Sequence, residues 1–171
     1  MSNSIDLKIK ATFGDDSTEF DFNVTNEDLD DIKETAADQW NKTHHDPNDE
    51  ESIEAEAGDM VLEVIDWDET PTQVRELTDE FFEFCDEFSR SSYEAEVFQA
   101  ALDAGVQITD IDEAYAGSFS SDEDFARDAH DQTKSGDEPT GWPYSCIDWE
   151  AAAKELMYDY CSANGHYFRN L

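Results

Sequence analysis

Apolar and polar residues alternate along two stretches near the start of the chain, Ile5 to Phe13 and Thr18 to Val24. An alternation with a period of two is typical of strands that bury one face. The turn-forming residues Gly14-Asp15-Asp16 lie between the two stretches. The pattern therefore predicts a β-hairpin.

The apolar spacing then changes to that of an amphipathic helix, which either Thr25 or Asn26 can cap. The residues expected to face inward from this helix are Leu29, Ile32, Ala36 and Trp40. After a polar loop, Ser52 to Ala57 and Met60 to Trp67 read as two more strands around Gly58-Asp59. Residues 1–70 are thus predicted to form a ββαββ subdomain.

The next stretch, Thr72 to Phe88, separates its residues onto two helical faces after Pro71, which suits a first helical turn. The apolar face comprises Val74, Leu77, Phe81, Phe84, Cys85 and Phe88. The opposite face comprises Glu76, Asp79, Glu80, Glu83, Asp86 and Glu87. Like charges at this spacing cost an isolated helix roughly 0.2–0.5 kcal/mol per pair, so the acidic face requires an explanation.

A second helix is predicted from the capping box Ser91-Ser92-Tyr93-Glu94 to Ala104, where Gly105 ends it. The two helices make residues 71–105 a helical middle subdomain. Short β-like patches follow around Ile108, Ile111 and Tyr115.

The remaining elements complete a C-terminal α+β subdomain over residues 106–171. Ser120-Ser121-Asp122-Glu123 has the spacing of an N-cap for a helix from Asp122 to Asp131. A further helix is lined by Ile147, Trp149, Ala152, Ala153 and Leu156. Asn164-Gly165 between β-formers predicts a terminal hairpin. The fold class expected from the whole pattern is α+β.

Composition adds one dominant fact, a formal net charge of −35 from 45 acidic and 10 basic residues in 171. An aromatic content of 12% and the clear periodicity favour a folded chain over a disordered one. A surface this negative repels nucleic acid and anionic lipid, and it attracts basic grooves. We therefore expect no direct binding to DNA or to membranes.

Other features restrict the class of protein further. There is no signal-peptide pattern and no long apolar run, and the three cysteines, Cys85, Cys146 and Cys161, form no CxxC pair. These features favour a cytoplasmic protein with reduced thiols. The sequence contains no P-loop, nucleophile elbow, dinucleotide fingerprint or zinc-ligand spacing, so we expect neither an enzyme nor a cofactor.

One loop has residues that could hold a divalent cation, and we interpret them as solvated instead. These residues are His44, His45, Asp46, Asp49 and Glu50.

The acidic helix has a spacing related to that of a nucleic acid. Glu76, Glu80, Glu83 and Glu87 recur once per helical turn, about 5.4 Å apart along the axis, which is of the same order as phosphate spacing. At one charge per roughly 1.7 Å of duplex axis, the net charge corresponds to on the order of 60 Å of B-DNA, or about 17 base pairs. Such a protein would present carboxylates where a DNA-binding enzyme expects phosphates.

Two other classes account for the same charge. Proteins of extreme halophiles carry acidic surfaces that keep them hydrated, although the excess of lysine over arginine here leans against that class. An acidic adaptor or chaperone-like protein would bind basic proteins without imitating DNA.

Three C-terminal motifs resemble the ArdA antirestriction family. Residues 112–126, DEAYAGSFSSDEDFA, are similar to its D-E-A-Y-x-G-x-F-x-S-x-x-D-F-A run. Residues 148–156, DWEAAAKEL, resemble its D-[YW]-E-x-x-A-x-[DE]-L helix, and residues 165–169, GHYFR, resemble its terminal G-x-x-F-R. The first 60 residues are similar only in their order of hairpin, helix and strand.

This resemblance implies an elongated, three-part α+β protein from a mobile genetic element such as a phage or plasmid. It also implies a homodimer that imitates bent DNA and occupies the DNA-binding cleft of a type I restriction–modification methyltransferase in the bacterial cytoplasm. Another DNA-binding defence complex, such as a CRISPR effector, is an alternative target. The expected phosphate-mimicking residues are Glu76, Asp79, Glu80, Glu83, Asp86, Glu87, Asp110, Asp112, Glu113, Asp122, Glu123, Asp124, Asp128 and Asp131. The signature residues, for a dimer contact or for the core, are Tyr115, Gly117, Phe119 and Phe125.

Overall fold

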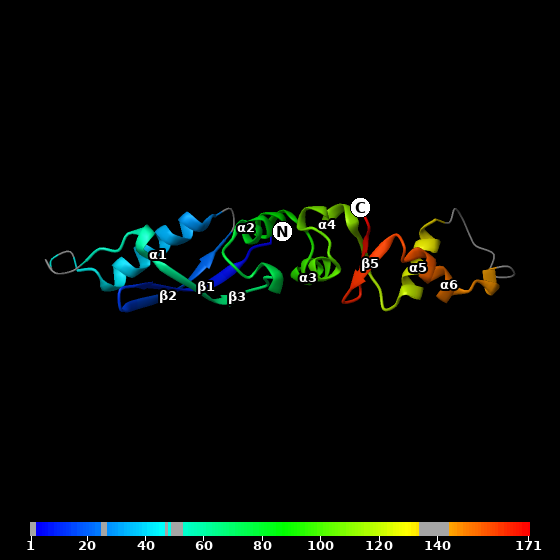
Figure 1. The fold of residues 1–171 in the computed structure, drawn as a ribbon, viewed down its shortest axis with the longest axis horizontal. Helices are drawn as coiled ribbons and strands as arrows, with labels where there is room; N and C mark the ends of the chain where they lie inside the picture. Colours follow the sequence, from blue (N-terminus) through cyan, green and yellow to red (C-terminus); the bar gives the residue numbers. More distant parts are fainter. Residues whose placement is uncertain (1–2, 25–26, 47, 49–52, 134–143) are drawn as a thin grey trace. The chain divides into compact units, whose positions relative to one another are not determined.

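Two antiparallel three-stranded sheets, with helices in both parts of the chain, make this an α+β protein (Figure 1). The computed structural model describes residues 3–24, 27–46, 48, 53–133 and 144–171. The chain divides into two compact units, Met1–Ala95 and Glu96–Leu171. The boundary between them falls inside the predicted middle subdomain, at the start of its second helix. Within the described ranges, no helix is long and apolar enough to cross a membrane.

The predicted N-terminal hairpin forms in the first unit and is joined by a third strand. The strands are β1 (Asp6–Phe13), β2 (Asp16–Asn23) and β3 (Val61–Trp67). They are antiparallel in the order β2-β1-β3, so β1 is the central strand. Leu7, Ile9 and Ala11 of β1 are fully buried, as the alternation predicts.

Helix α1 (Leu29–His44) packs on one face of this sheet (Figure 1). The structure places its cap at Asp28, whose carboxylate accepts from the backbone N–H groups of Asp30 and Asp31. The predicted caps, Thr25 and Asn26, lie outside the described residues. The core between helix and sheet comprises Ala11, Ala36, Ala37, Trp40, Ala55 and Met60.

The strand predicted from Ser52 to Ala57 is wrong over its described part, where residues 53–56 have no regular structure. The side chain of Asn41, on α1, makes two hydrogen bonds with the backbone of Ala55. Its Nδ2 donates to the carbonyl at 2.9 Å, and its Oδ1 accepts from the N–H at 2.8 Å. A short 3-10 turn, η1 (Ala57–Asp59), then leads into β3. The order of elements is therefore ββαβ, and the backbone of Ala55 is bonded to a helix side chain where the prediction expected a neighbouring strand.

The helix predicted from Thr72 to Phe88 is shorter at its start and is preceded by a separate turn. A 3-10 turn, η2 (Thr72–Val74), ends at Arg75, and α2 (Asp79–Arg90) begins after Thr78. Two local bonds hold the intervening bend: Arg75 Nε donates to Thr70 O at 2.9 Å, and Thr78 N donates to Glu76 O at 2.7 Å. The apolar face was predicted correctly, since Phe81, Phe84, Cys85 and Phe88 are all buried.

The helix after α2 also starts later than predicted. Ser91 is the C-cap of α2 and does not cap the next helix, which begins four residues later; its hydroxyl accepts from Tyr93 N at 2.8 Å. Helix α3 (Ala95–Ala104) ends at Gly105, as predicted. The patches around Ile108 and Ile111 are not strands but a 3-10 turn, η3 (Ile108–Asp110), and a single helical turn, α4 (Ile111–Ala114).

The second unit contains the other sheet. Its strands are β4 (Tyr115–Ser118), β5 (Tyr160–Ala163) and β6 (His166–Arg169), antiparallel in the order β4-β6-β5. The predicted hairpin is confirmed, with Asn164 and Gly165 both at positive φ, 52° and 81°. Helices α5 (Asp122–Gln132) and α6 (Trp149–Leu156) of this unit pack against each other. A 3-10 turn, η4 (Tyr144–Cys146), precedes α6.

Candidate protein-binding acidic surfaces

Carboxylates cover the side of α2 opposite its buried phenylalanines. Asp79, Glu80 and Glu83 are exposed, and none has an ion pair in the part of the chain that the structure describes. Without a nearby cation, these side chains keep their charge available to a partner protein. Neighbouring carboxylates repel one another on the free helix, and a basic surface would relieve that repulsion.

Glu76 belongs to the same surface although it precedes the helix. It lines a hollow of about 420 Å³ together with Thr72, Gln73, Arg75, Thr78, Asp79 and Glu80. Glu76 thus lies next to the first turn of α2 because of the bend before the helix, and it is not part of the helix as predicted. The regular row of four glutamates expected from the sequence is accordingly wrong at its first member.

The C-terminal end of α2 is different, because Arg90 neutralises part of it. Its guanidinium pairs with Glu87 Oε1 at 3.0 Å and with Asp86. All three side chains are at least partly exposed, so these pairs contribute well under 1 kcal/mol each to folding. They nevertheless divide the predicted set, since Asp86 and Glu87 already have a cation while Asp79, Glu80 and Glu83 do not.

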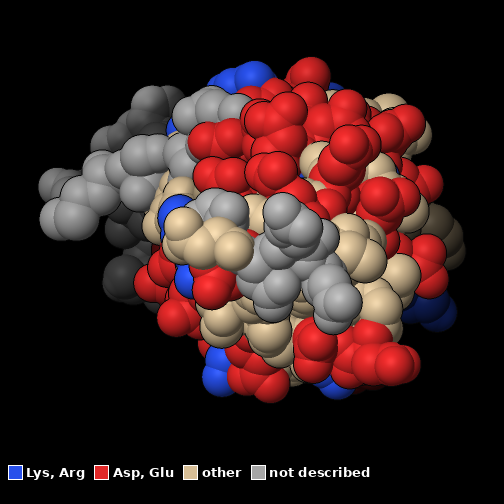
Figure 2. Space-filling view, turned by 90° about the vertical axis from the view of Figure 1, so that its left-hand side faces the viewer, with Lys and Arg blue, Asp and Glu red and all other residues tan. Residues whose placement is uncertain are grey.

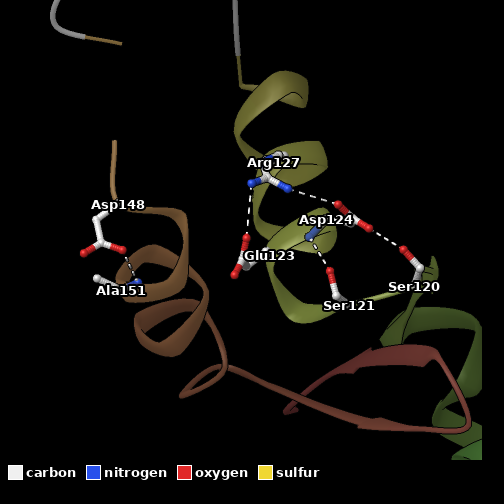
Figure 3. A network of polar contacts seen from close by, with 7 residues as sticks. All are labelled: Ser120, Ser121, Glu123, Asp124, Arg127, Asp148 and Ala151. Carbon is white, nitrogen blue, oxygen red and sulfur yellow. Dashed lines mark hydrogen bonds and ion pairs between the residues drawn. The ribbon is translucent and has the colours of Figure 1, made fainter. Parts of the chain in front are cut away.

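Helix α5 carries a similar local network (Figure 3). Ser121 caps the helix as predicted, accepting from Asp124 N at 3.2 Å. Arg127 then donates to Glu123 Oε2 and to Asp124 Oδ1, both at 3.1 Å. The hydrogen bond from Ser120, reinforced by Ser121 and Arg127, lowers the pKa of Asp124 below its ordinary value. Asp124 is thus held ionised, and both acids already have partners within the helix.

The other predicted acids of α5 also have local partners. Asp122 Oδ1 accepts from the buried hydroxyl of Tyr167, on β6, at 2.6 Å. Asp128 Oδ2 accepts from Gln132 Nε2 at 2.6 Å. Asp131 is exposed in the last turn of the helix. Helix α5 therefore uses several of its acids to hold its own unit together.

The predicted acids between α3 and α5 lie in a short segment made of η3 and α4. Asp112 and Glu113 are exposed on α4, and half-buried Asp110 lines a hollow of about 270 Å³. The same hollow is lined by Cys161 and Arg169. All of these residues belong to the second unit.

The signature residues pack inside the second unit. The Tyr115 hydroxyl lies 3.0 Å from His166 Nδ1, and its ring packs on Phe168. Phe119 contacts the rings of Phe125 and Tyr167, with centroids 5.1 and 5.6 Å apart. These contacts account for the residues within one chain, while a role in a dimer stays a prediction.

Gly117 has a specific backbone reason to be glycine. Its φ is +126°, a backbone conformation that residues with a side chain rarely adopt. A Cβ at this position would lie 3.0 Å from the ring of Phe119. It sits at an irregularity in the pairing of β4 with β6.

Sequence reasoning missed one acidic surface, on α1. A hollow of about 420 Å³ beside this helix is lined by carboxylates of Glu27, Asp31, Glu34, Asp38 and Glu54. Desolvation, together with Asp31 and Asp28, raises the pKa of Glu27 above its ordinary value. Figure 2, viewed from the side where α1 lies in Figure 1, shows Asp and Glu over much of the described surface and only scattered Lys and Arg. Glu27, Asp31, Glu34 and Asp38 recur about once per helical turn, and this spacing could have indicated the surface from the sequence. Glu54 lies beside them only in the folded structure.

The remaining candidates have local contacts. His44 Nδ1 lies 3.1 Å from Trp40 O and its ring stacks on Trp40, while hydrogen bonds from Asn48 lower the pKa of Asp46. Asp49 and Glu50 lie outside the described residues. Cys85 is buried, Cys161 half-buried and Cys146 exposed, and all three are free thiols.

No protein-family model matches the chain, and no curated protein or solved structure gives a significant match.

Proposed function

We propose that this protein is a DNA mimic that occupies the DNA-binding cleft of a type I restriction–modification methyltransferase and thereby inhibits the enzyme. The observation that carries the proposal is the group Glu76, Asp79, Glu80 and Glu83, exposed and without a cation partner among the described residues. Fixed carboxylates engage the same Lys and Arg side chains as phosphates and release the same counterions.

Two further observations support it. The net charge of −35 favours fast association with a basic cleft. The run from Asp112 to Ala126 resembles the signature of antirestriction proteins, and its Phe125 is buried against Phe119 and Tyr167 in the second unit.

The test is competition between the purified protein and duplex DNA for a type I methyltransferase, measured by displacement of labelled DNA. We expect saturable displacement that weakens steeply with added salt. The amide variant, with Glu76, Glu80 and Glu83 changed to Gln and Asp79 changed to Asn, should lose far more inhibition than a variant with any one of these changes.

A matched control removes the same number of charges elsewhere in the first unit. Asp15, Asp16, Asp59 and Asp68 are exposed and lie outside α2 and the turn before it, and their combined change to Asn should have a smaller effect. If the parent and the amide variant inhibit equally well, the acidic group of Glu76, Asp79, Glu80 and Glu83 does not replace DNA phosphates. Equal losses in both variants would show that only net charge matters.

A further inference from the structure

Strand β3 forms an edge of the first sheet. It pairs with β1 on one side only, in the order β2-β1-β3. Among the described residues, Trp67 O accepts from Thr70 N, and residues 61–65 make no backbone hydrogen bond outside the ladder with β1. Alternate N–H and C=O groups of this strand therefore point away from the sheet and can pair with another strand.

The inner face of β3 is incompletely covered. Leu62 and Val64 lie opposite Ala11 and Ile9 of β1 and point to the same side of the sheet. The two β1 residues have no exposed surface, whereas Leu62 and Val64 are half-buried. The apolar core is thus open along β3, and an added strand with apolar side chains on that face would cover it.

The outer face of β3 exposes large apolar side chains, which protected edge strands usually avoid. Val61 is 68% exposed and Ile65 is 42% exposed. Between them Glu63 faces Lys10, with 3.9 Å between their charged atoms. Ile65 is the unpaired residue at an irregularity in the ladder, so regular pairing extends over the four residues before it.

The opposite edge, β2, provides a comparison. Its residues on the outer face, Ser17, Glu19 and Asp21, are polar and exposed. Glu19 pairs with Lys8 at 3.5 Å, the counterpart of the pair on β3. The two edges therefore differ in exposed apolar surface while sharing a similar glutamate–lysine pair.

We propose that the free edge of β3 binds an extended basic segment of a partner protein, which adds to the sheet as a fourth strand. Its apolar residues would cover Leu62 and Val64, and its Lys or Arg residues would lie opposite Glu63. Charge identifies the occupant, since a second copy would bring another −35 against the first. This site recognises backbone and alternating side chains, so it goes beyond phosphate imitation.

The experiment titrates the full chain into a labelled synthetic peptide in which lysine and valine alternate, at physiological salt, and follows fluorescence anisotropy. We expect saturable binding and slower amide exchange at residues 61–64. Two further peptides carry N-methyl groups on every second backbone nitrogen, in the two possible phases. At least one should lose binding, because methylation removes the strand bonds and keeps the charge. Equal binding of all three peptides, or no binding, overturns the proposal.

A pair of protein variants separates this edge from general charge attraction. Glu63→Lys should weaken peptide binding roughly three- to thirtyfold, by replacing an opposite-charge neighbour with a like charge. Glu19→Lys makes the same charge change on β2 and should have little effect. Equal effects of the two variants overturn the proposal. So does exchange protection at residues 61–64 that rises with protein concentration in the absence of peptide, which would identify a second copy as the occupant.

Discussion

At the scale of single residues, one buried hydroxyl joins the last strand to a helix. Tyr167, on β6, is 4% exposed and donates to Asp122 at the start of α5. The bond assigns a structural task to an acid that the sequence had placed in the phosphate-mimicking set. Charge pattern alone cannot separate the two roles, because the partner lies 45 residues away.

We predict that Tyr167→Phe lowers the free energy of unfolding by about 1.5 kcal/mol, because it removes a hydrogen bond to a carboxylate. Urea unfolding followed by circular dichroism measures the change. Tyr158→Phe is the control, since Tyr158 is 70% exposed, and it should leave the midpoint unchanged. Indistinguishable midpoints for the two variants would contradict the structural role of the bond.

Alkaline pH provides a second prediction at this scale. Burial raises the pKa of Cys85 from 9.0 to about 12. Burial, together with the bond to Asp122, raises the pKa of Tyr167 from 10.0 to about 12. Both groups are neutral when protonated, so above their ordinary pKa values the folded state holds more protons than the unfolded state. Stability should therefore fall as the pH rises from about 9 towards 12.

Melting temperatures across this range test the assignment. Cys85→Ala should reduce the part of the decline that begins near pH 9, and Tyr167→Phe the part that begins near pH 10. Cys146→Ala, at an exposed thiol, should leave the pH dependence as it is. If all three variants follow the parent's slope, other groups cause the alkaline loss.

At the scale of elements, a glycine in the left-handed conformation ends α3. The end of α3 is a Schellman motif: Val106 N donates to Ala101 O at 2.8 Å, and Gly105 N donates to Leu102 O at 3.1 Å. The motif requires positive φ at Gly105, which is +82°.

We predict that Gly105→Ala destabilises the protein by about 1–2 kcal/mol, because an L side chain is strained in the left-handed region. Its Cβ would meet no atom within 4 Å, so the effect isolates backbone strain from steric clash. Gly58→Ala is the matched control, with equally open space and no left-handed φ. Thermal unfolding should separate the two variants, and equal stability would refute the backbone explanation.

At the scale of the whole molecule, self-repulsion from the charge of −35 competes with the two apolar cores. We predict that the protein is folded in dilute buffer and that its melting temperature rises moderately with salt, as screening reduces repulsion. Melts in dilute buffer and in molar KCl measure this. A chain that is unfolded in dilute buffer and folds only in molar salt would favour halophile adaptation over DNA mimicry.

The sequence by itself determined the features that depend on neighbours in the chain. The hairpin around Gly14, the Asn164-Gly165 hairpin and the Ser121 cap form where predicted. Turn chemistry, alternation and capping act over two to four residues, so the signal and the structure coincide. The buried face of α2 was also readable, because one helix face must meet the core.

Only the tertiary structure decided which backbone groups and carboxylates acquire distant partners. The side chain of Asn41 binds the backbone of Ala55, 14 residues away, and Tyr167 binds Asp122, 45 residues away. The arginine pairs on α2 and α5 join residues three or four positions apart and so follow helical spacing. Spacing cannot show the bond from Tyr167 to Asp122 or the lysine pairs between strands. Folding determines those contacts, because it places a tyrosine hydroxyl and two lysines of other elements beside particular carboxylates.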